Sequence, residues 1–108
     1  QVYYRLKGEN FEFDVNVLYT SIGRKHSNPP DNFLALGTHK NMSRVHAVIK
    51  WFPNDGWHLI IKGRNGLFID ETFYLPSDNV TSSYLLSDKT RIKIGDVIFF
   101  FILPKQDD

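Results

Sequence analysis

Cysteine is absent from this chain, and so are several other features that mark whole classes of protein. Without cysteine there is no disulfide framework, no thiol nucleophile and no zinc site built on thiolates. No stretch of about 18 apolar residues occurs, so we expect no membrane-spanning segment and no membrane partner. The longest apolar run, Val97–Leu103, has the length of a strand and ends at Pro104.

An excess of either charge is lacking as well. Thirteen Lys and Arg residues stand against 12 Asp and Glu residues, which gives a net charge of +1. A nucleic-acid-binding domain usually gathers a basic excess on one face. Acids and bases alternate along this chain, so we expect no direct binding of nucleic acid. Any cationic site has to be local.

A sustained helical pattern is also missing. Apolar residues recur with period two or in short solid runs, and sixteen aromatic residues favour a β core. A length of 108 residues suggests a single domain. Because the chain starts at Gln1 without Met, we expect residues 1–108 to be one domain excised from a longer protein.

Short segments with strand character are divided by turn residues. We predict strands at Val2–Leu6, Phe11–Val15, Leu18–Ile22, Phe33–Leu36, Val45–Phe52, Trp57–Lys62, Leu67–Ile69, Thr72–Leu75, Tyr84–Leu86, Arg91–Ile94 and Val97–Leu103. Turns at this spacing predict an all-β fold, a two-sheet sandwich of mostly antiparallel strands. The alternation of Lys89, Arg91 and Lys93 predicts an edge strand whose charges discourage further pairing.

Polar residues with a shared chemistry stand at the ends of these strands. Loops from one end of a sandwich could bring them together, and they offer guanidinium forks, a hydroxyl, an amide and free loop N–H groups. These groups suit a phosphate and a peptide backbone. The residues are Gly23-Arg24, Ser43-x-x-His46, Arg64 and Asn65-Gly66.

In this order and spacing, Gly-Arg, Ser-x-x-His and Asn-Gly resemble the signature of the forkhead-associated (FHA) domain. The likeness runs from Tyr4 to Pro104. It is greatest to the FHA domains of forkhead-type transcription factors and their plant relatives. The sequence segments that carry this likeness are Asn41–Ala47, Gly63–Gly66, Ile92–Asp96 and Phe101–Pro104.

The resemblance implies a function and a set of roles. The function is phosphothreonine-peptide recognition in a nuclear, transcription-linked regulatory protein, by a monomeric domain that needs no cofactor and binds a phosphothreonine-containing protein. Arg24 and Ser43 would bond the phosphate, and Asn65 would hold the main chain of the ligand. Gly23 and Gly66 would shape the loops.

Two basic positions leave their roles open. The family often has Ser or Thr before the asparagine, where this chain has Arg64, and the forkhead branch tends to be basic there. Arg44 follows Ser43 and is basic too. Both side chains could add charge to a phosphate pocket or point into water.

An enzyme is the first alternative, with Ser43 as nucleophile and His46 as base. Residues three apart on a strand point to opposite faces, and no G-x-S-x-G elbow is present, so we expect no catalysis. The resemblance instead implies that His46 braces the loops from inside the fold. The four histidines lack the spacing of zinc ligands, so we expect no metal.

Two further alternatives concern the same fold. Asn65-Gly66 could be an ordinary hairpin turn, a reading that does not conflict with binding. The domain could also bind proteins through a sheet face without any dependence on phosphate. Arg24, Ser43 and Asn65 argue against that second reading, because all three phosphate-site residue types are in place.

Overall fold

Eleven strands make up the fold in the part of the chain that the computed structural model describes, residues 1–77 and 83–105. They are β1 (Tyr4–Gly8), β2 (Glu12–Val15), β3 (Tyr19–Gly23), β4 (Phe33–Ala35), β5 (Ala47–Phe52), β6 (Gly56–Ile61), β7 (Leu67–Ile69), β8 (Thr72–Tyr74), β9 (Tyr84–Leu85), β10 (Thr90–Ile94) and β11 (Val97–Ile102). Each predicted segment overlaps one of them, in most cases with slightly different ends. The described residues hold no helix long and apolar enough to cross a membrane.

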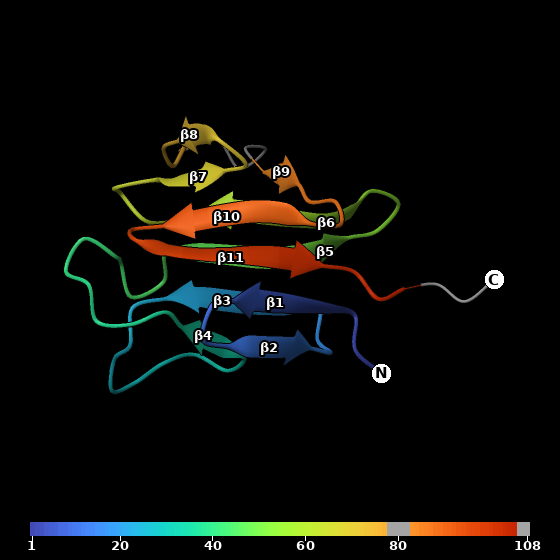
Figure 1. The fold of residues 1–108 in the computed structure, drawn as a ribbon, viewed down its shortest axis with the longest axis horizontal. Helices are drawn as coiled ribbons and strands as arrows, with labels where there is room; N and C mark the ends of the chain where they lie inside the picture. The colour runs from blue at the N-terminus through green and yellow to red at the C-terminus, as the bar shows by residue number, and fades with distance from the viewer. Residues whose placement is uncertain (78–82, 106–108) are drawn as a thin grey trace.

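The strands form two sheets that pack face to face (Figure 1). One sheet has the order β2-β1-β11-β10-β7-β8, and the other has the order β4-β3-β5-β6-β9. Among the described pairs only β3 and β4 run parallel; the others are antiparallel. The prediction of an all-β sandwich with mostly antiparallel strands is therefore confirmed.

Alternate side chains of both sheets meet in one apolar core. On β11, Phe99 and Phe101 are fully buried, while Ile98 and Phe100 are 37% and 38% exposed on the outer face. This alternation is the period-two geometry of a strand with one buried face. A fully buried large apolar side chain contributes about 1.5–3 kcal/mol to folding. Fully buried members of the core include Tyr4, Leu6, Ile22, Ala47, Ile49, Leu59, Ile92, Ile94, Phe99 and Phe101.

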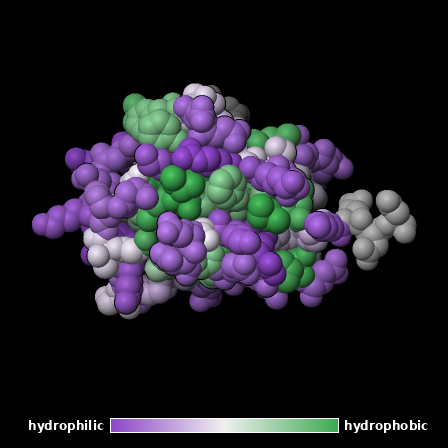
Figure 2. All heavy atoms as spheres, viewed as in Figure 1, coloured by the Kyte–Doolittle hydropathy of each residue, from purple (hydrophilic) through white to green (hydrophobic). Residues whose placement is uncertain are grey.

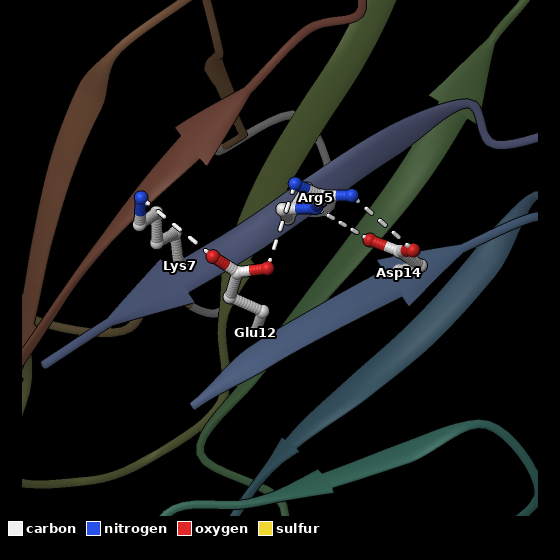
Figure 3. Close-up of polar contacts among 4 residues, drawn as sticks. All are labelled: Arg5, Lys7, Glu12 and Asp14. Carbon is white, nitrogen blue, oxygen red and sulfur yellow. Dashed lines mark hydrogen bonds and ion pairs between the residues drawn. The ribbon is translucent and has the colours of Figure 1, made fainter. Parts of the chain in front are cut away.

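The outer face of the six-stranded sheet combines an apolar strip with paired charges. Figure 2 shows the strip in the middle of this face, with hydrophilic residues around it. On β1, Arg5 Nε donates to Asp14 Oδ1 at 2.6 Å, and Lys7 Nζ lies 3.6 Å from Glu12 Oε1 (Figure 3). The hydrogen bond from Arg5 lowers the pKa of the Asp14 carboxyl. Exposed pairs of this kind stabilise a fold only slightly.

The prediction of an edge strand at β10 is wrong. β10 lies between β11 and β7, inside its sheet. Arg91 and Lys93 alternate with the buried Ile92 and Ile94 because one face of β10 covers the core and the other is the outer face. Lys89 precedes the strand in a left-handed conformation, with φ 70°. Charge alternation thus indicates a strand with one solvated face. Such a strand can lie inside a sheet as well as at its edge.

Candidate functional site

Three loops gather at one end of the sandwich. They connect β3 to β4, β4 to β5 and β6 to β7, and Figure 1 shows all three at the left, with both chain termini at the right. The sheet order explains the gathering, because β3, β5 and β6 are antiparallel neighbours. The end of β3, the start of β5 and the end of β6 therefore lie at the same edge. The predicted site residues stand in these loops.

Gly23 allows the first two loops to approach closely. It ends β3, and a Cβ atom at this position would lie 2.1 Å from the carbonyl oxygen of Arg44. Such a distance is sterically impossible, so only glycine fits here. The backbone N–H of Arg24 donates to the carbonyl oxygen of Ser43 at 2.9 Å. The chain therefore holds Arg24 and Ser43 on directly bonded backbone segments.

His46 fastens the second loop to the third. Its side chain is 1% exposed. The backbone N–H of Ser43 donates to His46 Nδ1 at 3.0 Å, so the ring proton is assigned to Nε2, which donates to the carbonyl oxygen of Gly66 at 2.7 Å. The His46 carbonyl oxygen also accepts bonds from Lys62 N and Gly63 N, both at 2.9 Å. One buried residue thus bonds both loops.

The expectation that Ser43 and His46 lie on one strand, and therefore point to opposite faces, is wrong. Residues 43–46 precede β5 and are not part of a strand, so the rule of opposite faces does not apply to them. The contact exists, but it joins the Ser43 backbone to the ring. Both ring nitrogens of His46 are therefore occupied by backbone groups, and neither is left to deprotonate the Ser43 hydroxyl.

The turn before β7 completes the arrangement. Gly66 N donates to Gly63 O at 3.0 Å, and Gly66 has φ +71°, where a side chain would be strained. A Cβ atom at Gly63 would overlap the His46 ring at 2.2 Å. The Asn65 side chain donates from Nδ2 to the carbonyl oxygen of Asn41 at 2.9 Å. The turn connects strands of different sheets, so the hairpin alternative is wrong.

The three arginines of the predicted site differ in exposure. Arg24 is half-buried, whereas Arg44 and Arg64 are exposed. In the described part of the chain, none of them lies within ion-pair distance of a carboxylate. Their guanidinium groups are therefore available to an external anion. Beside them the structure places the half-buried Ser43 and the exposed Asn65.

A pocket of about 500 Å³ opens next to Asn65. Of the predicted residues it includes Asn65, Gly66 and His46, but not Arg24, Ser43, Arg44 or Arg64. Sequence analysis missed its other walls, which are contributed by the second loop, β7, β8, β10 and the turn after β10. These residues are His39, Asn41, Leu67, Phe68, Phe73, Lys93, Gly95 and Asp96. Their positions follow from sheet order, which the sequence does not display.

A larger hollow, of about 610 Å³, lies elsewhere and contains none of the predicted residues. It is bordered by the β1–β2 turn, Leu36 and the start of β11. Its walls are mainly apolar, and their single cation, Lys7, stands with the acidic Glu9 and Asp96, a poor setting for a phosphate. Among the described residues no group of three His, Asp or Glu side chains could hold a metal ion.

A Ser-His-Asp group that the sequence did not reveal lies at the opposite end. His58 Nδ1 is 2.8 Å from Ser83 Oγ, and its Nε2 contacts a carboxylate oxygen of Asp55. A catalytic triad also needs a substrate cleft and oxyanion donors. Ser83 borders none of the three main cavities in the described structure. We interpret the group as a structural contact that holds the β5–β6 turn against the segment before β9.

Comparison with known proteins places this geometry in a family. The family model "FHA domain" matches residues 20–95, which include every predicted site residue. The pre-rRNA-processing protein FHL1 of Saccharomyces cerevisiae is 38% identical over 108 residues, covering 97% of this chain and 11% of that protein. The transcriptional activator FHA1 of Nicotiana tabacum is 32% identical over 103 residues, covering 93% of this chain and 48% of that protein. The chain thus spans from about a tenth to a half of these relatives.

Solved structures share the fold. The N-terminal FHA domain of Saccharomyces cerevisiae Rad53p, in complex with a phosphothreonine peptide, matches with a TM-score of 0.78 at 17% identity. The match covers 95% of this chain and 94% of that one. The family model covers most of the chain, and the loops that carry its motifs are bonded to one another as described. The protein belongs to the forkhead-associated family.

Proposed function

We propose that this chain is a phosphothreonine-peptide-binding module in a nuclear, transcription-linked regulator, and that it forms one domain of a longer protein. It binds and does not catalyse. One observation carries the proposal: three mutually bonded loops at one end of the sandwich present Arg24, Ser43 and Asn65 together. None of these side chains is needed for the core.

Each group has a chemical role in this proposal. The guanidinium of Arg24 and the hydroxyl of Ser43 bond the phosphate oxygens, and the Asn65 amide bonds the main chain of the peptide. A hydrogen bond to a charged group contributes about 1.5–3 kcal/mol. Two such bonds and a hydroxyl suit an affinity in the micromolar range. Arg44 and Arg64 stand beside them as further cations.

The names of relatives support the partner and the compartment. Rad53p was solved with a phosphothreonine peptide, and the tobacco relative is named as a transcriptional activator. We therefore propose a phosphothreonine-containing partner and a nuclear location for the parent protein.

A second candidate function is binding through the outer sheet face, without phosphate. Ile98 and Phe100 of β11 are more than a third exposed there. An apolar strip of this kind occurs on many protein-binding surfaces. Ile98 and Phe100 line a hollow that includes none of the residues proposed to contact phosphate, so variants of each surface can separate the two functions.

Arg24→Ala provides the test. We expect it to weaken binding of a phosphothreonine peptide by about 2 kcal/mol and to leave thermal stability nearly unchanged. Arg24→Lys should restore only part of the affinity, because an ammonium group lacks the planar fork. Calorimetric titration with a peptide and its unphosphorylated twin measures both effects. Arg91→Ala, on the outer sheet face, is the matched control.

Two results would contradict the proposal. The first is equal affinity for the phosphorylated and unphosphorylated peptides. The second is unchanged affinity in Arg24→Ala together with a loss in Phe100→Ala, which would favour the sheet face as the binding surface.

A further inference from the structure

Positive charge is concentrated in the three loops. The loops, residues 24–32, 36–46 and 62–66, contain one acidic residue, Asp31. They hold six of the 13 basic residues, which leaves seven for the rest of the chain against 11 of the 12 acidic residues. The near-neutral net charge therefore conceals a separation of charge along the molecule. The six loop cations are Arg24, Lys25, Lys40, Arg44, Lys62 and Arg64.

These six residues, named the loop cations from here on, lack acidic partners. On the outer sheet face Arg5 and Lys7 are paired with acidic side chains at 2.6–3.6 Å (Figure 3). No loop cation makes an ion pair within the described part of the chain. Five of the six are exposed, and Arg24 is half-buried. Like charges held together repel, so the cluster opposes folding unless an anion joins it.

The loops hold these cations in one region. Arg24 N bonds Ser43 O at 2.9 Å, Lys25 N bonds Gly37 O at 2.7 Å, and Lys62 N bonds His46 O at 2.9 Å. The backbones that carry the charges are thus bonded to one another. The Lys and Arg side chains remain free to change rotamer, but the backbone positions from which they extend are fixed. A ligand that reaches one loop therefore meets the field of all three.

One phosphate does not balance this charge. A phosphothreonine carries about −1.5 to −2 near pH 7. Six cations around one dianion leave roughly four positive charges without a partner. Lys25, Lys40 and Lys62 have no role in the proposed phosphate contacts, so their partners have to come from elsewhere in the ligand.

We propose that the segment bound by this domain is acidic beyond its phosphothreonine. Anionic groups close to the phosphothreonine, either Asp and Glu side chains or a second phosphate, would meet Lys25, Lys40 and Lys62. This inference rests on the proposed function. A nucleic acid would also supply negative charge. The peptide is favoured because the site pairs a serine hydroxyl and an amide with a single half-buried arginine, and because the rest of the chain is acidic.

Matched peptides test the inference. Fluorescein-labelled phosphothreonine peptides carry Glu, Gln or Lys at the same flanking positions, and a further peptide carries Gln and a second phosphothreonine. Each has an unphosphorylated twin, and a single-stranded oligonucleotide of equal charge is titrated alongside. Fluorescence anisotropy gives Kd for each at about 50 mM and about 300 mM salt.

We expect the Glu peptide or the doubly phosphorylated peptide to bind about tenfold more tightly than the Gln peptide, with a smaller advantage at high salt. The triple variant Lys25→Gln, Lys40→Gln, Lys62→Gln should lose most of that advantage. The control Lys7→Gln, Lys50→Gln, Lys105→Gln removes the same charge elsewhere and should keep it.

The measurements distinguish a failure of the proposed function from a failure of this inference. Equal binding of phosphorylated and unphosphorylated peptides overturns the proposed function itself. Phosphate-dependent binding with equal affinity for the Glu, doubly phosphorylated and Gln peptides overturns only this inference. An oligonucleotide that binds as tightly as the best peptide, and loses its affinity in the loop variant, shows that the loop cations serve nucleic acid instead.

Discussion

A single buried histidine, His46, connects the second of the three loops to the third. The sequence-based expectation that His46 braces the loops agrees with its burial and with the bonds of both ring nitrogens. Arg24 and Asn65, by contrast, contribute side chains that the core does not need. Residues of the same motif therefore divide into one that holds the loops together and others that we propose contact the ligand.

His46→Ala should reduce stability first and binding second. It removes two hydrogen bonds and leaves a cavity, so we expect a loss of about 2–4 kcal/mol in the free energy of unfolding. Urea denaturation measures this loss. His39→Ala, an exposed histidine of the same loop, is the control and should unfold almost as the wild type does. A His46→Ala protein that unfolds normally but no longer binds phosphopeptide would make His46 a ligand contact.

At the scale of strands, periodicity predicted where strands lie but not how they pair. All eleven segments were identified, because burial of one face imposes period two on the local sequence. Strand neighbours depend on distant contacts. Charge alternation therefore placed β10 at an edge, and the Asn65-Gly66 turn left a hairpin open where the chain crosses between sheets.

The candidate site was predictable to a similar depth. Motif order identified the residue types and the three loops that carry them. The contacts between loops were not readable, because Asn65 bonds Asn41 across 24 positions and Gly63 packs on His46. The pocket beside Asn65 was missed because its far walls come from β7 and β10. Which side chains contact phosphate stays a prediction.

Gly63→Ala tests the packing between the third loop and the second. A methyl group at this position would meet the His46 ring at 2.2 Å, so the turn has to shift. We expect a loss of about 1–3 kcal/mol in stability. In a His46→Ala background the same substitution should cost much less, because the ring is gone. A double-mutant cycle measured by urea denaturation gives this coupling. Additive effects would show that the ring and the glycine are energetically independent.

At the scale of the whole molecule, the core that joins the sheets includes Leu36 and Met42 of the second loop but none of the side chains proposed to contact phosphate. Tyr4 of β1 lies in this core with 0% exposure, and its ring centroid is 4.8 Å from those of Trp57 and Phe101. Burial raises the pKa of the Tyr4 phenol, and the neighbouring Thr20 hydroxyl offsets only part of this. Neither hydroxyl has a partner at normal hydrogen-bonding geometry among the described residues.

Alkaline pH should therefore weaken the sandwich through Tyr4. In the unfolded chain the phenol ionises near pH 10, whereas in the folded protein it stays protonated to a higher pH. The folded state then binds more protons, so stability is intact below about pH 10 and falls above it by up to about 1.4 kcal/mol per pH unit. Urea denaturation of the wild type and Tyr4→Phe from about pH 8 to 11 isolates this term, because both proteins share every other titrating group. Parallel curves for the two proteins would show that the Tyr4 hydroxyl reaches solvent in the folded state.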